Sequence, residues 1–303
     1  MLQRIRAFFD LHGVMEVETP VLSRAATSEV HLDSWCVTSN DQPEQTYFLQ
    51  TSPELFMKRL LADSAEDIYQ ICKVFRAGEQ GTRHNPEFTL LEWYRVGFDL
   101  AALMQEVESL LNELLSNCIR APAMHTTYEA VFQDILHIDP FSASMEQLTQ
   151  CYQDKTGSQP PSMSNRQDAL DLLMSEVIEP ALPANRLVFV NGYPAQQASL
   201  ARIDDNDPRT ARRFEVFCGG LELANGFEEL TDANEQQQRM HHENQQRQAA
   251  GLDEVPLDEH FLSALRAGLP ACSGVAVGLD RILMLMTNET QIDRVISFSA
   301  DRT

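Results

Sequence analysis

The segment FRAGEQGTRHNPEFTLLEWY, residues 75–94, links two stretches that both have the composition of β-strands. Residues 68–76 and 87–95 are rich in β-branched and aromatic side chains, whereas the ten residues between them contain two glycines and a proline. This pattern predicts a β-hairpin with a long loop. Because a loop of that length is more than a connector needs, we expect it to carry function.

The elements predicted on either side of this hairpin favour an α+β fold, in which an antiparallel sheet is flanked by helices. Gly219-Gly220 suggests a turn or a bulge, and Asn225-Gly226 suggests a turn. We expect one domain over residues 1–303 with a small, mainly helical insertion at about 120–185. The predicted elements are a helix at 2–11, a strand at 14–20, a helix at 99–118, a strand at 186–190, a strand at 213–223, and a strand at 274–278 that feeds a helix.

The composition is that of a globular protein with a strongly acidic surface. The 303 residues are 43% hydrophobic and carry a formal net charge of −22. Such a charge opposes broad binding to nucleic acid. The sequence contains neither a long apolar run typical of a membrane span nor an N-terminus typical of a secretory signal. Six cysteines without CxxC spacing predict free thiols in a reducing cytoplasm.

Two arginines are candidates for holding a phosphate chain. Arg76 ends the first strand of the hairpin, and Arg281 opens the helix that follows Gly278. Fixed guanidinium groups on separate elements suit the two ends of a triphosphate, and a nearby glycine lets the backbone approach a flat base. The alternative is that each arginine forms an ordinary surface ion pair. No P-loop, GxGxxG, HExxH or GxSxG motif is present.

Three glutamates recur at intervals of seven residues. Glu215 and Glu222 would face opposite sides of a regular strand, but a bulge between them would bring both to one face. Carboxylates placed together in this way are ligands that suit Mg²⁺ beside a phosphate substrate. In so acidic a chain, a solvated acidic edge that includes Glu229 is the alternative.

These segments together resemble the three motifs of the class II aminoacyl-tRNA synthetases. The helix at 2–11 together with GVMEVETP (residues 13–20) resembles motif 1, residues 75–94 resemble motif 2, and GVAVGLDRILML (274–285) resembles motif 3. TSPELFMKRLL (51–61) and RFEVFCGGLELANGFEELTD (213–232) resemble the lysyl-tRNA synthetase subgroup. The similarity covers nearly the whole chain in the correct order.

Motif 1 includes the first residues of this sequence, so we expect no anticodon-binding OB domain of the kind that lysyl-tRNA synthetases carry. The chain is therefore similar to the truncated family of elongation factor P–(R)-β-lysine ligases. The resemblance implies activation of (R)-β-lysine or lysine with ATP and Mg²⁺ and its transfer to a lysine of elongation factor P. It also implies a homodimer, no stable tRNA binding and no membrane association.

The resemblance assigns roles to individual residues. Arg76 would hold the ATP α-phosphate and Arg281 the γ-phosphate. The nucleotide would further contact Ala77, Gly78, Asn85, Phe88, Glu222, Leu223 and Gly278. Glu215 and Glu222 would hold Mg²⁺. The amino-acid pocket would comprise Ser52, Pro53, Glu54, Tyr94, Asn225, Glu229 and Ala276, with Glu54 and Glu229 facing the two ammonium groups of the substrate.

Two positions depart from the family pattern. The glutamate that follows the motif 2 arginine is displaced by one residue to Glu79, so we expect the backbone to replace its contact with the nucleotide. Ala276 stands where lysyl-tRNA synthetases have glycine, and we expect its methyl group to favour β-lysine. Two other functions remain open: charging of tRNA, and a degenerate, non-catalytic binding module.

Overall fold

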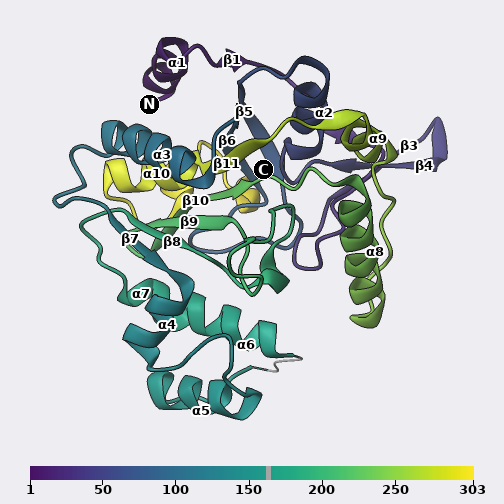
Figure 1. Cartoon of the computed structure of the whole chain (residues 1–303). Helices are drawn as coiled ribbons and strands as arrows, with labels where there is room; N and C mark the ends of the chain where they lie inside the picture. The colour runs from purple at the N-terminus through teal and green to yellow at the C-terminus, as the bar shows by residue number, and fades with distance from the viewer. Residues whose placement is uncertain (162–164) are drawn as a thin grey trace. The chain divides into compact units, whose positions relative to one another are not determined.

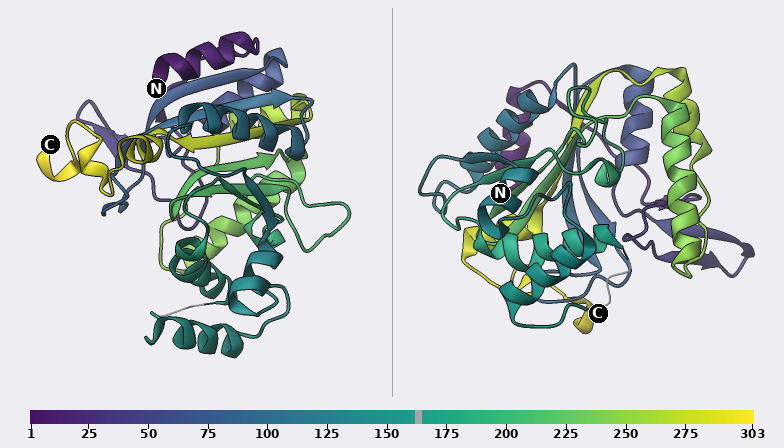
Figure 2. Two further views of the ribbon diagram at one scale, coloured as in Figure 1. Left: turned by 90° about the vertical axis from the view of Figure 1, so that its left-hand side faces the viewer. Right: turned by 60° about the horizontal axis from the view of Figure 1, so that its bottom comes forward.

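The computed structural model describes residues 1–161 and 165–303 and divides into two compact units. The first unit comprises Met1–Leu103 and Glu228–Thr303, and the second comprises Met104–Phe227 (Figures 1 and 2). The segment TGSQPPSMSN at 156–165, whose prolines and polar residues predict a linker of the helical insertion, lies partly outside the described residues. Within the described ranges, no helix is long and apolar enough to cross a membrane.

The first unit contains the predicted hairpin at the centre of its sheet. Its strands follow the order β1-β5-β6-β11, and all pairs are antiparallel except the parallel pair of β1 with β5. The prediction of a strand at 14–20 is only partly correct, because two residues of this segment form the ladder. The strands are β1 (Met15–Glu16), β5 (Ile68–Phe75), β6 (Glu87–Val96) and β11 (Cys272–Gly278).

Helix α1 (Leu2–Leu11) packs on this sheet through an aromatic contact. The Phe9 ring stacks on Tyr69 of β5 and meets Trp93 of β6 edge-on, with ring centroids 4.3 and 5.3 Å apart. Because side chains alternate along a strand, Glu92 and Tyr94 point to the opposite face of the sheet. That opposite face is therefore available for a site.

The remaining helices of the first unit have clear packing partners. Helix α2 packs against α9, and α9 also packs against α8, as Figures 1 and 2 show. A small separate sheet of order β2-β4-β3 forms a hairpin that projects to the right in Figure 1. The bounds are α2 (Glu54–Ser64), α8 (Ala233–Ala249), α9 (Glu259–Gly268), α10 (Leu279–Thr287), β2 (Leu22–Ser23), β3 (Cys36–Ser39) and β4 (Gln42–Leu49).

The second unit has a four-stranded order β10-β9-β8-β7, in which only β7 and β8 are parallel. Its helices enclose an apolar core around Tyr128, Phe132 and Phe217. A π-helical turn at Met174–Ile178 joins α6 to α7. The elements are α3 (Leu100–Leu114), which enters from the first unit, β7 (Met124–Thr127), α4 (Tyr128–Leu136), α5 (Met145–Thr156), α6 (Arg166–Leu173), α7 (Glu179–Ala181), β8 (Val188–Asn191), β9 (Arg213–Cys218) and β10 (Leu221–Glu228).

The structure decides two glycine-based predictions in this unit. Of the two alternatives for Gly219-Gly220, the turn is correct: the pair forms the two-residue turn of the β9–β10 hairpin, with φ values of +61° and +71° that glycine adopts without strain. Asn225-Gly226 is not a turn, because both residues pair with β9 inside β10. The register shift lies instead between Glu222 and Ala224. The glycine residues therefore indicate that this hairpin contains a turn, but they do not locate the register shift.

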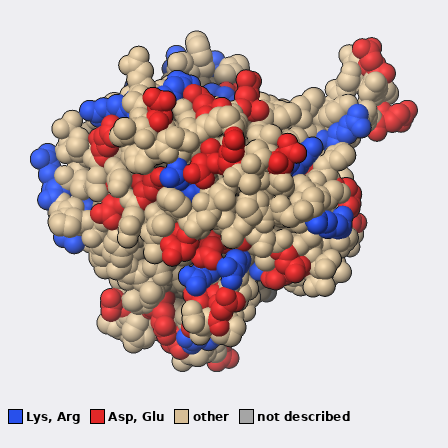
Figure 3. Space-filling model, turned by 45° about the horizontal axis from the view of Figure 1, so that its top comes forward, with Lys and Arg blue, Asp and Glu red and all other residues tan. Residues whose placement is uncertain are grey.

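The acidic composition is visible on the surface. Figure 3 shows carboxylates spread across the displayed face, with arginine and lysine side chains interspersed among them. All six cysteines are free thiols. The fold class is confirmed as α+β, with the correction that one edge pair in each unit is parallel.

Candidate active site

One face of the first unit's sheet carries a row of predicted site residues. Cross-strand pairing places Gly274 opposite Tyr94 and Ala276 opposite Glu92. Because residues two apart on a strand share a face, all four side-chain positions point the same way. Glu92 and Tyr94 are both almost fully buried, and the Tyr94 hydroxyl donates to Glu92 Oε1 at 2.7 Å.

A buried lysine that the sequence analysis did not identify lies at this face. Lys58 Nζ is 2.6 Å from Glu54 Oε1 and 2.5 Å from Glu229 Oε2. Lys58 and Glu229 are each only 1% exposed. The available signal was the i,i+4 spacing of Glu54 and Lys58 on a predicted helix, which brings the two side chains together. The two glutamates predicted as counter-charges for a substrate thus share one ammonium of the protein.

The start of α2 sets the position of this pair. Pro53 is the N-cap residue of the helix, and the Ser52 hydroxyl accepts a hydrogen bond from the backbone N–H of Glu54 at 3.4 Å. Glu54 therefore occupies the first helical position, from which Lys58 lies one turn further along the same face.

The cluster of Glu54, Glu92, Glu229 and Lys58 contains three carboxyl groups and one ammonium, so its formal charge with all groups ionised is −2. Burial is the main cause that raises the pKa of Glu92, to about 8, with Glu54 adding to the rise. Burial also raises the pKa of Glu229, although Lys58 opposes it. Burial alone would lower the pKa of Lys58, but Glu229 and Glu54 more than reverse that effect. A cluster with this charge deficit favours additional positive charge.

The raised pKa of Glu92 predicts a pH-dependent stability. The folded protein keeps this proton up to about pH 8, whereas the unfolded chain loses it near pH 4.5. The free energy of unfolding should therefore fall as pH rises between these values, by about 1.4 kcal/mol per pH unit for this one group. Denaturant unfolding at several pH values measures the slope. Glu92→Gln should remove this contribution, and identical slopes for the two proteins would contradict it.

Gly274 is required by the close approach of its neighbours. A Cβ atom at this position would lie 2.3 Å from Tyr94 Cε1 and 2.7 Å from Glu229 Oε1. Both neighbours are buried, so neither side chain can move away freely. The glycine thus allows the ring and the carboxylate to meet over the strand.

We expect Gly274→Ala to lower the free energy of unfolding by about 1–3 kcal/mol, because the added methyl group overpacks a closed site. Thermal or denaturant unfolding measures the change. The matched control is Gly81→Ala, since a Cβ atom there meets nothing within 4 Å. Equal stability of the two variants would show that Tyr94 and Glu229 are not held in place.

The predicted phosphate-binding Arg76 stands beside the ring of Phe88. Its guanidinium carbon is 5.1 Å from the Phe88 ring centroid, which is a cation–π distance. Arg76 Nη1 is 3.5 Å from Glu79 Oε1, and Nε donates to the Thr51 carbonyl at 3.4 Å. Each polar contact is long, so the arginine is oriented by weak partners. The displaced motif 2 glutamate is thus placed against Arg76.

Arg281 lies at the third position of α10, whose N-cap is Gly278. Its Nη2 atom is 2.8 Å from His84 Nε2 in the motif 2 loop. The neighbouring Asp280 accepts a hydrogen bond from the Thr89 backbone N–H at 2.6 Å, which ties α10 to β6. The structure therefore brings motifs 2 and 3 together within the first unit.

The other predicted nucleotide contacts in this loop have partners of their own. The Ala77 N–H donates to the Asp33 carbonyl at 2.8 Å, and Gly78 has a φ of +80°. The Asn85 side chain donates to the Glu87 carbonyl at 2.6 Å and accepts from the Ala300 N–H at 3.0 Å. Asn85 thus anchors the loop to the C-terminal segment.

The predicted metal ligands lie in the second unit. Glu222 is opposite Phe217, which shares a strand face with Glu215, so both carboxylates point to one face. The cause is the hairpin pairing and not the predicted bulge at the glycine pair. Glu215 Oε2 accepts from the Tyr193 hydroxyl at 2.6 Å, and Oε1 pairs with Arg213. No cluster of three or more metal-ligating side chains occurs in residues 1–161 and 165–303.

Two further predicted residues follow on the same strand. Leu223 is buried and lies at the register shift between Glu222 and Ala224. The Asn225 side-chain oxygen accepts a hydrogen bond from Arg213 Nε at 3.2 Å, directly opposite Glu215. The structure therefore gathers four predicted residues around this bulge.

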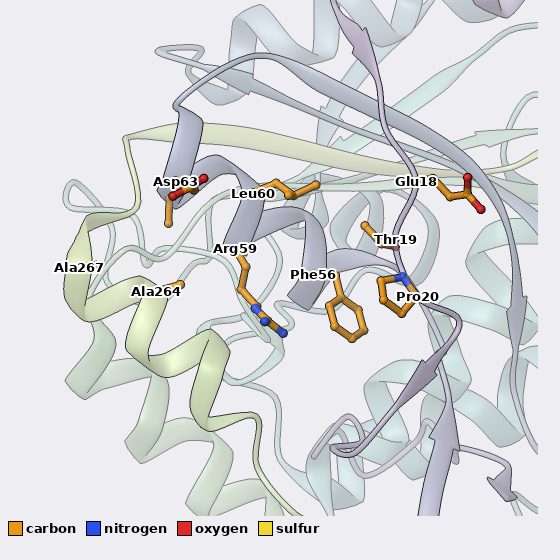
Figure 4. A pocket seen from close by; sticks show the side chains of 10 residues that line it. Glu18, Thr19, Pro20, Phe56, Arg59, Leu60, Asp63, Ala264 and Ala267 are labelled. Carbon is orange, nitrogen blue, oxygen red and sulfur yellow. The ribbon is translucent and has the colours of Figure 1, made fainter.

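A separate cavity of about 390 Å³ lies on the outer side of α2 (Figure 4). Phe56 and Arg59 project into it, with the guanidinium carbon 5.2 Å from the ring centroid, and Ala264 of α9 faces them. It contains none of the predicted site residues. The helix thus presents Glu54 and Lys58 to the sheet and a different set of residues to this cavity.

Comparison with known proteins agrees with these motifs. The family model for class II tRNA synthetases (D, K and N) matches residues 1–302. The chain is similar to elongation factor P–(R)-β-lysine ligases from Pseudoalteromonas translucida (45% identity), Salmonella arizonae (44%) and Haemophilus ducreyi (45%). These alignments cover all of this chain and 94%, 93% and 92% of the respective relatives. The chain therefore belongs to the class II tRNA synthetase family.

Proposed function

We propose that this protein activates (R)-β-lysine with ATP and transfers it to a lysine side chain of elongation factor P. The buried Glu54–Glu92–Glu229–Lys58 cluster is the observation that carries the proposal. Its formal charge of −2 matches a substrate with two ammonium groups, because burial makes such a deficit costly unless cations fill it. The full-length similarity to ligases of this name supports the choice of acceptor.

The first step is formation of an aminoacyl-adenylate. A substrate carboxylate oxygen attacks the α-phosphorus, the bond to the bridging oxygen breaks, and pyrophosphate leaves. Arg76 would neutralise charge on the α-phosphate, and Arg281 would hold the γ-phosphate. Phe88, whose ring already contacts a guanidinium, would stack on the base. Ala77, Gly78, Asn85, Leu223 and Gly278 would complete the nucleotide contacts.

The residues present fit a Mg²⁺ ion that arrives with ATP. Glu215 and Glu222 share one strand face, and they are close enough for Glu222 to contribute to the raised pKa of Glu215, of which burial is the main cause. Mg²⁺ is usually held by one or two carboxylates together with phosphate oxygens and water. The ion would supply charge neutralisation for the phosphates. Glu215 would have to share its oxygens with Tyr193 and Arg213.

In the second step, the amine of the acceptor lysine attacks the acyl carbon and AMP leaves. The amine must lose its proton before or during the attack.

Incubation with ATP, (R)-β-lysine and elongation factor P, followed by intact mass measurement, tests the whole proposal. A gain of one lysyl unit on the factor is expected. Label transferred to tRNA instead would favour a charging enzyme, and no pyrophosphate exchange with any lysine isomer would favour a non-catalytic module.

Exposed apolar side chains support the homodimer that motif 1 implies. Leu2 and Leu11 of α1 and Met15 of β1 are 41%, 84% and 46% exposed. Large apolar groups left open on neighbouring elements are typical of a surface that another chain covers. We propose that a second copy of this chain covers it.

Ala276 gives a prediction about substrate choice. Its methyl group stands opposite Glu92 on the site face, so it occupies space that glycine would leave free. Ala276→Gly should raise activation of α-lysine relative to β-lysine by about tenfold, within the effect of one methyl group. Pyrophosphate exchange with both isomers measures the ratio. An unchanged ratio would remove Ala276 from the specificity determinants.

A further inference from the structure

Apart from the carboxylate oxygens of Glu229, one of which lies 2.5 Å from Lys58 Nζ, three buried acceptor atoms around the site have no hydrogen-bond donor. They are Gln50 Oε1, Gln70 Oε1 and Glu92 Oε2. Their residues are only 6%, 2% and 2% exposed. A buried acceptor without a donor costs free energy, so native proteins rarely keep several together unless something else supplies the donors.

The three acceptors belong to one cluster. Gln70 and Glu92 are direct cross-strand partners on β5 and β6, and Ala276 of β11 continues the same row. Cys72 follows Gln70 on the same strand face. Burial and then the charge of Glu92 raise the pKa of the Cys72 thiol, while hydrogen bonds with Gln70 and Gln50 oppose the rise. All three residues therefore surround this thiol.

The donor ends of the two amides have partners within the protein. Gln50 Nε2 donates to Cys72 Sγ at 3.7 Å and to the Lys73 carbonyl at 3.1 Å. The side-chain amide of Gln70 interacts with the same thiol. Because the amide nitrogens already have partners, the carbonyl oxygens of both side chains can accept hydrogen bonds from a bound group. Lys58 does not fill this role, because its ammonium contacts Glu54 and Glu229.

The three acceptors of Gln50, Gln70 and Glu92 fit an alkylammonium group. Such a group offers three N–H donors and one positive charge. These match the two amide oxygens and the ionised form of Glu92, whose proton leaves when the ammonium binds. A hydroxyl group offers one donor and no charge. A water molecule offers two donors and leaves the charge deficit unchanged. The ammonium therefore satisfies the cluster most completely.

We propose that Gln70 and Gln50, together with Glu92, form the binding site for one ammonium group of the substrate. Gln70 is the specificity-determining residue, since it pairs directly with Glu92 across the strands in the row that Ala276 completes. This inference rests on the proposed function for the identity of the substrate. It adds two neutral amides to a pocket otherwise recognised by its carboxylates.

Two substitutions at Gln70 should separate the affinity for the substrate from the stability of the unliganded protein. One should weaken binding alone, and the other should lower stability alone. Gln70→Met removes the unpaired acceptor, so the dissociation constant and KM for (R)-β-lysine should rise by about tenfold or more while the unliganded protein stays as stable as the wild type. Gln70→Glu keeps the acceptor and adds charge, so it should bind the ammonium at least as well while lowering the melting temperature of the unliganded protein.

Calorimetric titration with (R)-β-lysine, pyrophosphate exchange and thermal unfolding provide the readouts. The KM for ATP should not change in Gln70→Met. Thr19→Val is the matched control, because Thr19 Oγ1 is also a buried acceptor without a partner but lies outside the cluster. Its affinity for the diamine should equal that of the wild type.

Several outcomes would overturn the inference. An unchanged affinity in Gln70→Met would show that the oxygen does not contact the substrate. A rise in KM for both substrates together with a lower melting temperature would assign Gln70 a structural role only. Either result leaves the proposed function intact if the wild type still activates (R)-β-lysine. Failure of the wild type to bind the diamine at all would overturn both.

Discussion

Replacing Lys58 with methionine is expected to lower the free energy of unfolding by about 3–5 kcal/mol, the largest stability effect at this site. The ammonium lies between Glu54 and Glu229 at 2.6 and 2.5 Å and is almost fully buried. Methionine fills much of the same space but leaves two carboxylates without their cation. The cost therefore comes from unpaired buried charge and not from a cavity.

Chemical denaturation of Lys58→Met and of the double variant Lys58→Met/Glu229→Gln measures this effect. The second substitution removes one of the stranded charges, so it should restore part of the lost stability. A double variant no more stable than the single one would show that the ion pair is not the source. Wild-type stability of the single variant would show that the lysine is not needed for charge balance.

Replacing Arg76 with lysine is expected to lower the rate of pyrophosphate exchange by about 10²–10³-fold, the loss typical of removing one oriented donor from a transition state. Lysine keeps the charge but lacks the planar fork that can hold two phosphate oxygens. It also cannot lie flat over Phe88 as the guanidinium does at 5.1 Å. The free energy of unfolding should change little, because the polar contacts of Arg76 are long.

Steady-state exchange kinetics with ATP and (R)-β-lysine test this expectation. Arg266→Lys on α9 is the matched control, since that side chain is partly exposed and lies outside the site. An Arg76→Lys enzyme as active as the control would exclude the proposed role at the α-phosphate. A large loss of stability would assign Arg76 a role in holding the loop.

Individual residues show which structural features a sequence pattern can predict. The hairpin strands around the motif 2 loop formed as predicted, because their composition favours strands and the glycines and proline between them favour a loop. Glu215 and Glu222 do share a face as expected, but through the pairing of two strands. The spacing of seven residues could not distinguish a bulge from a turn at Gly219-Gly220, since two consecutive glycines suit both.

The sequence does not identify Glu92 as a site residue, because its role depends on its three-dimensional neighbours. It stands in a strand of otherwise apolar and aromatic residues, where a carboxylate is unusual and could have been noticed. Its importance depends on a neighbour two residues away, Tyr94, and on partners from distant segments. Gly274 opens the segment that resembles motif 3, but only the positions of Tyr94 and Glu229 explain why glycine is needed there.

The sequence by itself determined the family and the α+β class, because short-range periodicity and ordered motifs are properties of contiguous residues. Only the tertiary structure decided how charge is balanced at the site. Lys58 and Glu229 are separated by most of the chain, yet one ion pair joins them. Burial then decides which carboxyl groups keep a proton and which need a cation, and burial arises only when helix and sheet close over one another.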